Sequence, residues 1–411
     1  MKLLENAKKS CIELQEMNQS DISKILEDYS NLLVKNIKEI VKENQKDLKK
    51  MNVNDPKYDR LLLNEQRIKS IAHDVQNIAN LKFNSYKLIE KYKAKSGIEI
   101  QKMSVPIGVV GIIYESRPNV TIDAISICLK TQNVCVLKGA PEADFSNQIL
   151  VKIAKQVFKK HKLNENVVVL LKPDVDSTKM LIQADKYIDV CIPRGGQGLI
   201  NFVRDNAKVP VIETGAGVVH IYVDKSANIK KAQDVIFNAK TRRPSVCNSV
   251  DGIIIHKAML NKLDQIIKPI IEKNTIIHAD EESYKVLNKK VPAKLLKKAN
   301  KKHFGMEFLS LQISIKTVTS GDEAIDHIQK HTSKHSECII TEDKKVAEKF
   351  CKIIDSAVVY VNTSTAFTDG GEFGMAAEIG ISTQKLHARG PFALNELTTY
   401  KWIVNSDGKI R

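Results

Sequence analysis

The stretch Val105-Pro106-Ile107-Gly108-Val109-Val110-Gly111-Ile112-Ile113-Tyr114 is almost wholly apolar and is expected to form a buried strand. A second apolar stretch, Asn133–Lys138, follows it, and an amphipathic helix is expected over about 144–161. Further strands are expected at Val167–Leu171, Tyr187–Ile192, Val209–Ile212 and Val218–Val223. Apolar strands that alternate with amphipathic helices predict an α/β fold with a parallel sheet covered on both faces.

The segments on either side of this series differ from it. Residues 1 to about 90 show apolar positions at helical spacing, and the segment from 94 to 106 alternates as a half-buried strand or hairpin. A second series of strands and helices starts near 225, with its clearest strands at Gly252–Ile255, Glu337–Thr341 and Ala357–Asn362. The segment 363–391 is rich in Gly, Ser and Thr and is typical of a structured functional loop, and Thr398–Val404 alternates again as a strand.

Composition narrows the class of protein. The chain has 411 residues, of which 43% are hydrophobic, so two or three globular domains are expected. It has no run of about 18 apolar residues, which argues against a transmembrane helix. The first nine residues soon turn polar and do not resemble a secretory signal, so the cytoplasm is the expected location.

The net charge of +16 raises the question of a nucleic-acid partner. The excess is carried by 55 lysines against nine arginines, with a dense stretch from Lys285 to Lys302. Nucleic-acid sites usually concentrate arginine and place aromatic residues beside it, and this stretch lacks that arrangement. We therefore favour solvated lysines on exposed faces and expect no nucleic-acid or membrane partner.

The seven cysteines fit neither a disulfide framework nor a structural zinc site, because their number is odd and no CxxC pair occurs. No metal site is expected. Most of the cysteines lie in apolar runs and are expected to be small buried residues. Cys247 is different, since it follows Arg242-Arg243-Pro244-Ser245-Val246 in a polar and basic setting.

A glycine-rich turn follows the strand expected at 187–192. Arg194, Gly195, Gly196 and Gly198 lie between that strand and an amphipathic helix. Such a turn can present backbone N–H groups and a helix N-terminus to a phosphate. The full GxGxxG spacing is absent, so a plain tight turn is an equal alternative.

Lys138 lies at the carboxyl end of its strand, where α/β sheets bind ligands. It could hold ribose hydroxyls or a phosphate of a cofactor. The alternative is one more surface lysine among many.

Glu213, at the end of an expected strand, and Cys247 are plausible partners in acyl transfer. Lys240, Arg242 and Arg243 are expected to stabilise the Cys247 thiolate, which is the reactive form, and to lower its pKa.

The arginines are also unevenly placed. Five of the nine fall in or beside the motifs described here, and a planar guanidinium suits a carboxylate or a phosphate. They are Arg117, Arg194, Arg242, Arg243 and Arg389.

Over almost its whole length the chain resembles the γ-glutamyl phosphate reductase family, also called glutamate-5-semialdehyde dehydrogenases, a branch of the aldehyde dehydrogenase superfamily. The resemblance is carried by long motifs in the family's order. These are Pro106–Thr121, Ile192–Gly198, Asn238–Thr241 with Arg243–Asn248, and Thr368–Pro391.

The resemblance implies two parallel-sheet βα domains and a small oligomerisation element. The cofactor domain would span 1–223, the catalytic domain with Cys247 would span 224–362, and 363–411 would supply an active-site loop and a C-terminal strand. The hairpin near 94–106 would join that strand in a homo-oligomer.

The resemblance also implies an activity. This is the NADPH-dependent reduction of L-glutamyl 5-phosphate to L-glutamate 5-semialdehyde and phosphate, the second step of proline biosynthesis, with a functional link to glutamate 5-kinase. Cys247 matches the family's nucleophile, and Asn119 is expected to help stabilise the oxyanion. Residues assigned to NADP(H) are Lys138, Arg194, Gly195, Gly196, Gly198, Glu213 and Glu307, with Glu213 in a supporting role. Residues assigned to the substrate are Arg117, Arg243, Asn362 and Arg389.

The sequence departs from the family pattern at a few positions: Ala140-Pro141, Val218-Val219, Arg242 and Ala366. Two other activities stay open. One is an acylating dehydrogenase that uses an acyl-CoA, and the other is a basic RNA-binding protein on an inactive dehydrogenase fold.

Overall fold

The computed structural model describes residues 1–53, 55–375 and 378–411. Its internal contacts divide the chain into two compact units. Unit 1 comprises Met1–Thr214, Gly374–Gly380 and Phe392–Arg411, and unit 2 comprises Gly215–Phe373 and Ile381–Pro391. Residues 376–377, within the predicted functional loop, lie outside the described residues.

Unit 1 contains the parallel sheet that the sequence predicts. Its strand order is β5-β4-β3-β6, and each neighbouring pair is parallel. The strands are β3 (Val109–Tyr114), β4 (Val134–Lys138), β5 (Val168–Leu170) and β6 (Val190–Arg194). All of β3 is buried, as a strand covered on both faces requires.

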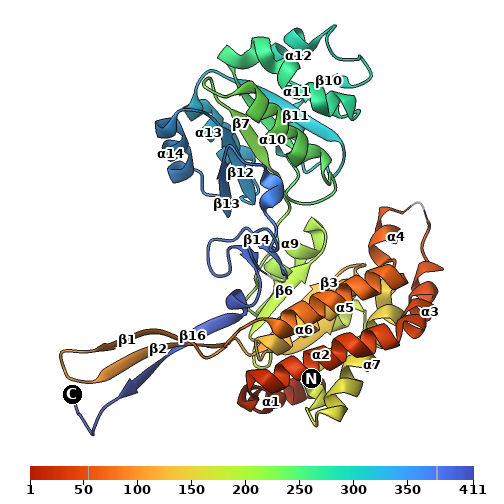
Figure 1. Ribbon diagram of the computed structural model, residues 1–411, viewed down its shortest axis with the longest axis vertical. Coiled ribbons are helices and arrows are strands. Elements are labelled where there is room, and N and C mark those ends of the chain that lie inside the picture. The colour runs from red at the N-terminus through yellow and green to blue at the C-terminus, as the bar shows by residue number, and fades with distance from the viewer. Residues whose placement is uncertain (54, 376–377) are drawn as a thin grey trace. The chain divides into compact units, whose positions relative to one another are not determined.

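Helices cover this sheet (Figure 1). The predicted helix over 144–161 is confirmed as α7 (Asp144–Lys160), and α6 (Pro118–Lys130) follows β3. The helical region expected before residue 90 is also confirmed, and its α2 and α5 pack against each other and against α6. The other helices of unit 1 and their bounds are α1 (Lys2–Glu16), α2 (Gln19–Lys35), α3 (Ile37–Leu48), α4 (Pro56–Leu61), α5 (Glu65–Asn80), α8 (Val175–Gln183) and α9 (Gln197–Asn206).

The apolar stretch 105–114 is divided between two sheets, which the sequence does not predict. Val105 and Pro106 end β2 (Glu99–Pro106), and β3 begins at Val109. The break occurs at Gly108, which has a φ of 128° and whose Cβ, if present, would lie 2.2 Å from Oδ2 of Asp189. A side chain there would meet both backbone strain and a clash, so glycine allows the chain to change sheets.

The second sheet of unit 1 is antiparallel and has the strand order β1-β2-β16. β1 (Leu88–Lys93) pairs with β2, and β2 pairs with β16 (Thr398–Asn405). The expected pairing of the 94–106 region with the C-terminal strand is therefore confirmed. The turn of the hairpin lies between β1 and β2, so the hairpin begins earlier than residue 94.

Unit 2 is built on a seven-stranded parallel sheet with the order β10-β9-β11-β8-β7-β12-β13. Side chains alternate between two apolar cores: Ile253 and Ile255 join one core, and Ile254 joins the other. Helices α10 and α11 contribute to the first core, and α13 and α14 contribute to the second. The strands are β7 (His220–Val223), β8 (Gly252–His256), β9 (Ile276–Ala279), β10 (Leu296–Lys298), β11 (Gln312–Val318), β12 (Ser336–Ile340) and β13 (Val358–Val361). The helices are α10 (Ile229–Thr241), α11 (Leu263–Glu272), α12 (Glu281–Leu287), α13 (Gly321–His331) and α14 (Lys344–Ile353), and a short ribbon is formed by β14 (Gly380–Ser382) and β15 (Gly390–Phe392).

The boundary between the units and one strand differ from the sequence-based expectation. The contacts place the unit boundary at Thr214/Gly215, before β7, whereas the expected boundary at 223 follows it. The reason is that β7 pairs with β8 and β12 and so belongs to the sheet of unit 2. The strand expected at 209–212 is reduced to one isolated bridge between Val211 and Cys191.

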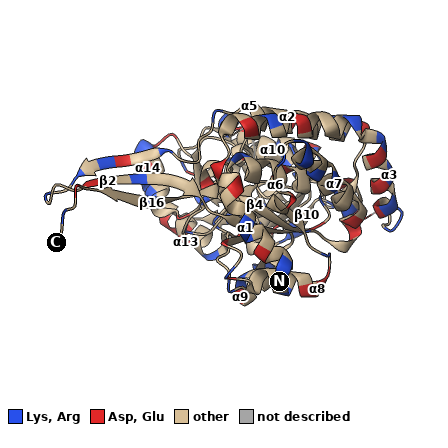
Figure 2. Cartoon of the chain, turned by 90° about the horizontal axis from the view of Figure 1, so that it is seen from below, with Lys and Arg blue, Asp and Glu red and all other residues tan. Residues whose placement is uncertain are grey.

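The dense lysine stretch near residue 290 is solvated, as the sequence indicates. Every lysine from Lys285 to Lys302 is exposed. Blue and red positions alternate along α2 and α3 (Figure 2). Within the described ranges, none of the helices has the length and apolar character needed to cross a membrane.

Candidate active site

Unit 1 brings Lys138 and Arg194 to the carboxyl edge of its sheet. Lys138 ends β4 beside Ile113, and Arg194 ends β6 beside Tyr114, so the two flank the end of β3. Burial lowers the pKa of half-buried Lys138, while Asp174 and Glu142 oppose the shift. A lysine in this position is available to a polar or anionic ligand.

The glycine-rich turn leads into α9, with Gly196 as the helix N-cap. Gly195, Gly196 and Gly198 are exposed. The backbone N–H of Gly196 donates to Oε2 of Glu115 at 3.0 Å, and a Cβ on Gly195 would lie 2.7 Å from the Glu115 carboxyl carbon. The sequence reasoning missed Glu115 as a site residue. Its carboxylate occupies a backbone donor at which a phosphate was expected.

These residues fit a phosphate-bearing dinucleotide. A helix N-terminus with exposed glycines binds anions through backbone N–H groups, and a lysine lies at a nearby strand end. The Gly196 N–H already donates to the Glu115 carboxylate, which shows that this helix start binds a carboxylate oxygen.

The start of α6 contains two further expected residues. Arg117 is the helix N-cap and is exposed. The Asn119 amide donates to Oδ2 of Asp123 at 3.2 Å, which orients it. Burial raises the pKa of Asp123 to about 7. No sequence pattern pointed to Asp123, because an acidic residue inside a helix usually faces solvent.

Glu213 and Cys247, expected as partners, fall in different units. Within unit 1, Oε2 of Glu213 lies 3.8 Å from an Arg204 nitrogen, and the adjacent Thr214 hydroxyl donates to Pro193 O at 2.7 Å. The Glu213 segment is thus fixed beside β6.

In unit 2, Cys247 lies in the loop between α10 and β8, at the amino edge of the sheet. It is half-buried. The next residue anchors the loop: the Asn248 amide donates to Thr368 O at 3.0 Å, and the Thr365 hydroxyl donates to Asn248 O at 2.8 Å. The Asn248 amide also donates to Ala366 O at 3.4 Å.

Gly217 lies against the backbone of Cys247. A Cβ on Gly217 would be 1.6 Å from the Cys247 carbonyl oxygen and 2.6 Å from its Cα. The Gly217 N–H donates to Oε1 of Glu307 at 2.8 Å. Glu307, expected at the cofactor, therefore contacts Gly217, the residue that packs against the backbone of Cys247.

Lys240 is engaged differently from the expectation. It is fully buried, its ammonium donates to Val250 O at 2.7 Å, and it lies 3.5 Å from Oδ1 of Asp251. Its charge is thus offset by a carboxylate in the interior, and it is not a free cation beside the thiolate. Arg242 and Arg243, which follow the C-terminus of α10, are exposed.

Five of the other six cysteines are buried. Burial raises the pKa of Cys11 to about 11 and that of Cys191 and Cys338 to about 12. Cys351 is exposed, and burial of part of its side chain still raises its pKa.

Asn362 and Arg389 also have protein partners. Asn362 follows β13 at the carboxyl edge, where its amide donates to Thr341 O at 2.8 Å and accepts from Thr341 N at 3.0 Å. Arg389 donates to Asp355 at 2.8 Å. Hydrogen bonds from Lys385 and Arg389 lower the pKa of Asp355 to about 2. Substrate binding by Asn362 and Arg389 stays a prediction. Asn362 lies at the carboxyl edge of the sheet and the Cys247 loop lies at the amino edge, so this position does not favour a role for Asn362 in binding the substrate.

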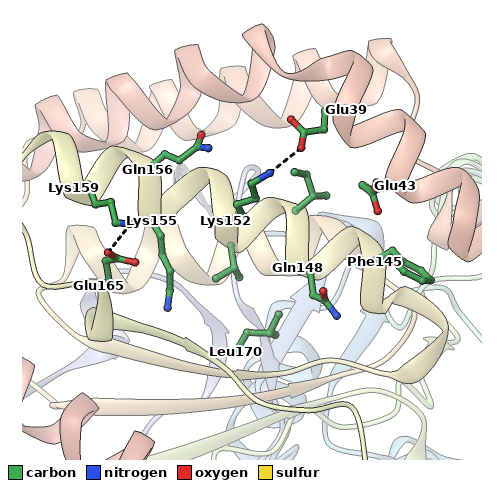
Figure 3. A pocket seen from close by; sticks show the side chains of 12 residues that line it. Glu39, Glu43, Phe145, Gln148, Lys152, Lys155, Gln156, Lys159, Glu165 and Leu170 are labelled. Carbon is green, nitrogen blue, oxygen red and sulfur yellow. Dashed lines mark hydrogen bonds and ion pairs between the residues drawn. The ribbon is translucent and has the colours of Figure 1, made fainter.

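Two pockets lie away from these residues. One, of about 660 Å³, lies between α3 and α7 in unit 1, where ion pairs join Lys152 to Glu39 and Lys159 to Glu165 (Figure 3). The other, of about 240 Å³, lies at the carboxyl edge of unit 2 beside Tyr222. None of the expected site residues lines either pocket.

The sequence pattern of the aldehyde dehydrogenase family matches residues 2–303. The γ-glutamyl phosphate reductase of Chlorobium phaeobacteroides is 49% identical over 410 residues, covering 100% of this chain and 98% of the relative.

The chain belongs to the aldehyde dehydrogenase family.

Within this family its curated relatives near 50% identity are γ-glutamyl phosphate reductases, and the chain is an oxidoreductase of that branch. The crystal structure of the Thermotoga maritima γ-glutamyl phosphate reductase agrees with a TM-score of 0.96 at 38% identity, covering 100% of this chain and 99% of that one. An acetylating aldehyde dehydrogenase from Geobacillus thermoglucosidasius shares the fold, with a TM-score of 0.69 at 20% identity, covering 100% and 97%. The expected α/β dehydrogenase fold is confirmed.

Proposed function

We propose that this oxidoreductase reduces L-glutamyl 5-phosphate to L-glutamate 5-semialdehyde with NADPH, through a thioester on Cys247, in proline biosynthesis. The observation that carries the proposal is the Cys247 loop, a half-buried thiol whose backbone lies against Gly217 and whose neighbour Asn248 is anchored on both sides. Full-length relatives that carry the name of this reaction support the choice of substrate.

The cofactor would be held at the carboxyl edge of unit 1. Lys138 suits the adenosine ribose and a 2′-phosphate, which favours NADPH over NADH. Arg194 and the exposed turn of Gly195, Gly196 and Gly198 suit the pyrophosphate. Glu213 would support this edge from its place beside β6. Glu307 is the candidate for the nicotinamide ribose. When bound, the cofactor supplies the hydride.

The residues of the chain perform the remaining chemistry. The Cys247 thiolate attacks the acyl carbon, and the bond to phosphate breaks, so that phosphate leaves with the electron pair and takes up a proton. The Cys247 N–H and the Asn119 amide would stabilise the oxyanion. After reduction the thiohemiacetal collapses, which releases the aldehyde and restores the thiolate.

The substrate carries a phosphate and a carboxylate, for which exposed arginines are suited. Arg117 and Arg243 are both exposed. Arg389 already binds a carboxylate that stays ionised, so an anionic substrate would exchange with Asp355 there.

The test is the NADP-dependent oxidation of the semialdehyde in the presence of phosphate. Cys247→Ser should lose about a thousandfold or more in turnover, because a serine hydroxyl has no comparable anionic form at pH 7, while cofactor binding persists. The control is Cys351→Ser, which removes the other accessible thiol. Substantial activity in Cys247→Ala would contradict the covalent mechanism. Activity with coenzyme A but not with phosphate would instead favour the acyl-CoA reaction.

Iodoacetamide gives an independent measurement. It should label Cys247 first and abolish activity in step with labelling, and substrate should protect the thiol because the thioester consumes it.

We also propose a homo-oligomer formed through the β1-β2-β16 sheet. Its outer strand β16 exposes Tyr400, Trp402 and Val404, each about half accessible, beside unpaired backbone groups. Light scattering at micromolar concentration should give a multiple of 46.1 kDa. A particle of monomer mass would contradict it.

We also propose a functional link to glutamate 5-kinase, because the acyl phosphate must be supplied by phosphorylation of glutamate.

A further inference from the structure

The turn that carries Glu307 is held from two sides by buried groups of unit 2. The Phe308 N–H donates to Oδ1 of Asp251 at 3.1 Å. On the other side, Nε2 of His220 lies 3.3 Å from Phe304 O, and Nδ1 of the same ring lies 3.2 Å from Glu337. The segment before β11 is therefore fixed at both ends by side chains from neighbouring strands.

This turn transmits its position to the nucleophile. Glu307 Oε1 accepts the N–H of Gly217 at 2.8 Å, and the Cα of Gly217 faces the Cys247 carbonyl with no room for a methyl group. A shift of the turn would move the carboxylate, the glycine and the backbone of Cys247 together.

Asp251 is itself fixed by Lys240. The ammonium lies 3.5 Å from Oδ1, and the two side chains are 0% and 4% exposed. A buried ion pair of this kind is weak evidence for stability, because an apolar pair of similar volume often stabilises a fold as well. The placement of a carboxylate oxygen at the Phe308 N–H is an effect that an apolar pair would not reproduce.

We propose that Asp251 is a positioning residue for the nucleophile. Its carboxylate, held by Lys240, fixes the turn that carries Glu307, and Glu307 fixes the Gly217 backbone against which the Cys247 loop rests. The proposal rests on Cys247 as the nucleophile of the proposed function, and it adds Asp251 and Lys240, to which that function gives no role.

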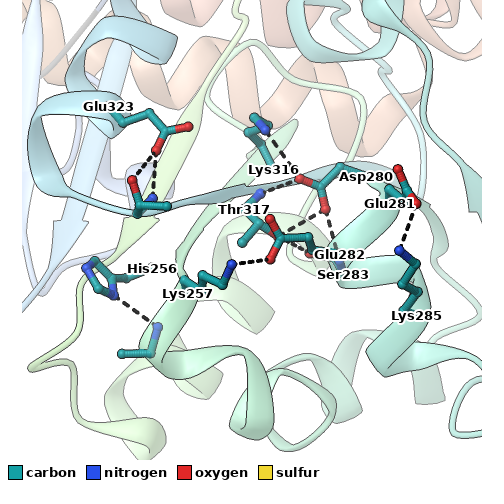
Figure 4. A network of polar contacts seen from close by, with 12 residues as sticks. His256, Lys257, Asp280, Glu281, Glu282, Ser283, Lys285, Lys316, Thr317 and Glu323 are labelled. Atoms are coloured by element: carbon teal, nitrogen blue, oxygen red, sulfur yellow. Dashed lines mark hydrogen bonds and ion pairs between the residues drawn. The ribbon is translucent and has the colours of Figure 1, made fainter.

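The opposite edge of the same sheet provides a matched control. Asp280 accepts the Thr317 N–H at 2.7 Å and lies 3.5 Å from the Lys316 ammonium, so it repeats the arrangement of Asp251 and Lys240 (Figure 4). Asp280 also caps α12 through Ser283 N at 3.0 Å. It follows β9 at the carboxyl edge, away from the Cys247 loop.

The test compares three double variants by melting temperature, by turnover and by the iodoacetamide alkylation rate of Cys247, followed on its own peptide without substrate or cofactor. K240M/D251N keeps an oxygen acceptor for Phe308 and should stay within about threefold of wild type in both rates. K240M/D251L removes the acceptor and should lower turnover and alkylation about tenfold or more, since small misplacements of reacting groups cost large factors. K316M/D280L should melt earlier, because it removes a helix cap, while both rates stay close to wild type.

Unchanged or faster alkylation in K240M/D251L would overturn the proposal, as would an equal slowing in K316M/D280L. If K240M/D251L does not fold, Glu307→Ala and Glu307→Gln decide the matter. Only the alanine variant removes the acceptor of Gly217, so it alone should slow alkylation of the cofactor-free protein, and equal rates in the two would overturn the proposal. Because alkylation requires no turnover, this failure is distinct from that of the proposed reaction, which an active Cys247→Ala protein would show.

Discussion

The two parallel sheets present their candidate residues at opposite edges. In unit 1, Lys138 and Arg194 lie at the carboxyl ends of β4 and β6, next to the N-terminus of α9. In unit 2, Gly217 precedes β7, Cys247 precedes β8 and Glu307 precedes β11, all at the amino edge.

The two edges of a parallel sheet stabilise charges of opposite sign. A carboxyl edge brings together helix N-termini, which favour anions such as cofactor phosphates. An amino edge receives helix C-termini, such as that of α10 before the Cys247 loop, and these favour cations. The basic residues Lys240, Arg242 and Arg243 follow this rule. The Cys247 thiol lies at this edge of unit 2, where its loop is packed closely against Gly217.

Disturbing the packing between Gly217 and the Cys247 loop should have the greatest effect on turnover. Gly217→Ala would place a methyl group 1.6 Å from the Cys247 carbonyl oxygen, so the loop must move. Turnover should fall by about a hundredfold or more. The control is Gly321→Ala at the carboxyl edge of the same sheet, where only the Tyr222 hydroxyl lies within 4 Å, at 3.9 Å. Near-normal steady-state rates for Gly217→Ala would refute the packing argument.

Acid should destabilise unit 2 relative to unit 1. Eight of the ten histidines belong to unit 2, and burial lowers the pKa of His335 to about 4. The unfolded chain takes up this proton near pH 6.5, so His335 contributes stability above that value and loses it as pH falls toward 4. Between pH 7 and pH 5 this costs unit 2 about 2 kcal/mol. Burial also lowers the pKa of His327 in unit 2 to about 3, which adds to this loss. The raised pKa values of Asp123 in unit 1 and Asp251 in unit 2 act in the opposite direction, because the folded state binds those protons more tightly.

Hydrogen exchange of the backbone amides of β12, in unit 2, and of β3, in unit 1, measures this difference in acid sensitivity. The free energy of opening at β12 should fall on acidification relative to that at β3, and His335→Asn should reduce the fall. Equal slopes in the two strands, or an unchanged slope in the variant, would show that the units do not differ in this way.

A smaller effect is expected from a substitution of Lys138 at the carboxyl edge of the unit 1 sheet. Lys138→Met should raise KM for NADPH about tenfold and weaken the preference over NADH, because it removes a charged partner of the 2′-phosphate. The matched control is Lys225→Met, since Lys225 follows β7 at the carboxyl edge of the other sheet. Initial rates over a range of NADPH and NADH concentrations provide the measurement. An equal change in both variants, or a wild type that favours NADH, would contradict the assignment.

The parts of unit 1 that follow simple rules could be predicted from sequence. β4 and β6 are apolar runs, so Lys138 and Arg194 could be placed at strand ends and the Gly195 turn at a helix start. The sheet of unit 2 was also expected, although β7 was assigned to the wrong side of the boundary, since an apolar run does not reveal which sheet it joins.

Other parts of the site depend on contacts between residues that the sequence pattern does not bring together. The charge of Lys240 suggested a partner for the thiolate, but its burial against Asp251 could not be inferred from neighbouring residues. The contact of Gly217 with Cys247 joins residues 30 positions apart. The resemblance identified Cys247 and Glu307, but no local signal linked Glu307 to Gly217 or pointed to Asp251.

The carboxylate of Glu115 at the Gly196 N–H has a consequence for how a cofactor would arrive. The Glu115 carboxylate accepts one backbone donor at the start of α9, so a pyrophosphate bound through that donor would have to replace the carboxylate. Binding then becomes an exchange of ligands at one donor. The released carboxylate would be free to turn to solvent, and the electrostatic environment of the helix start would change little between the free and the loaded enzyme.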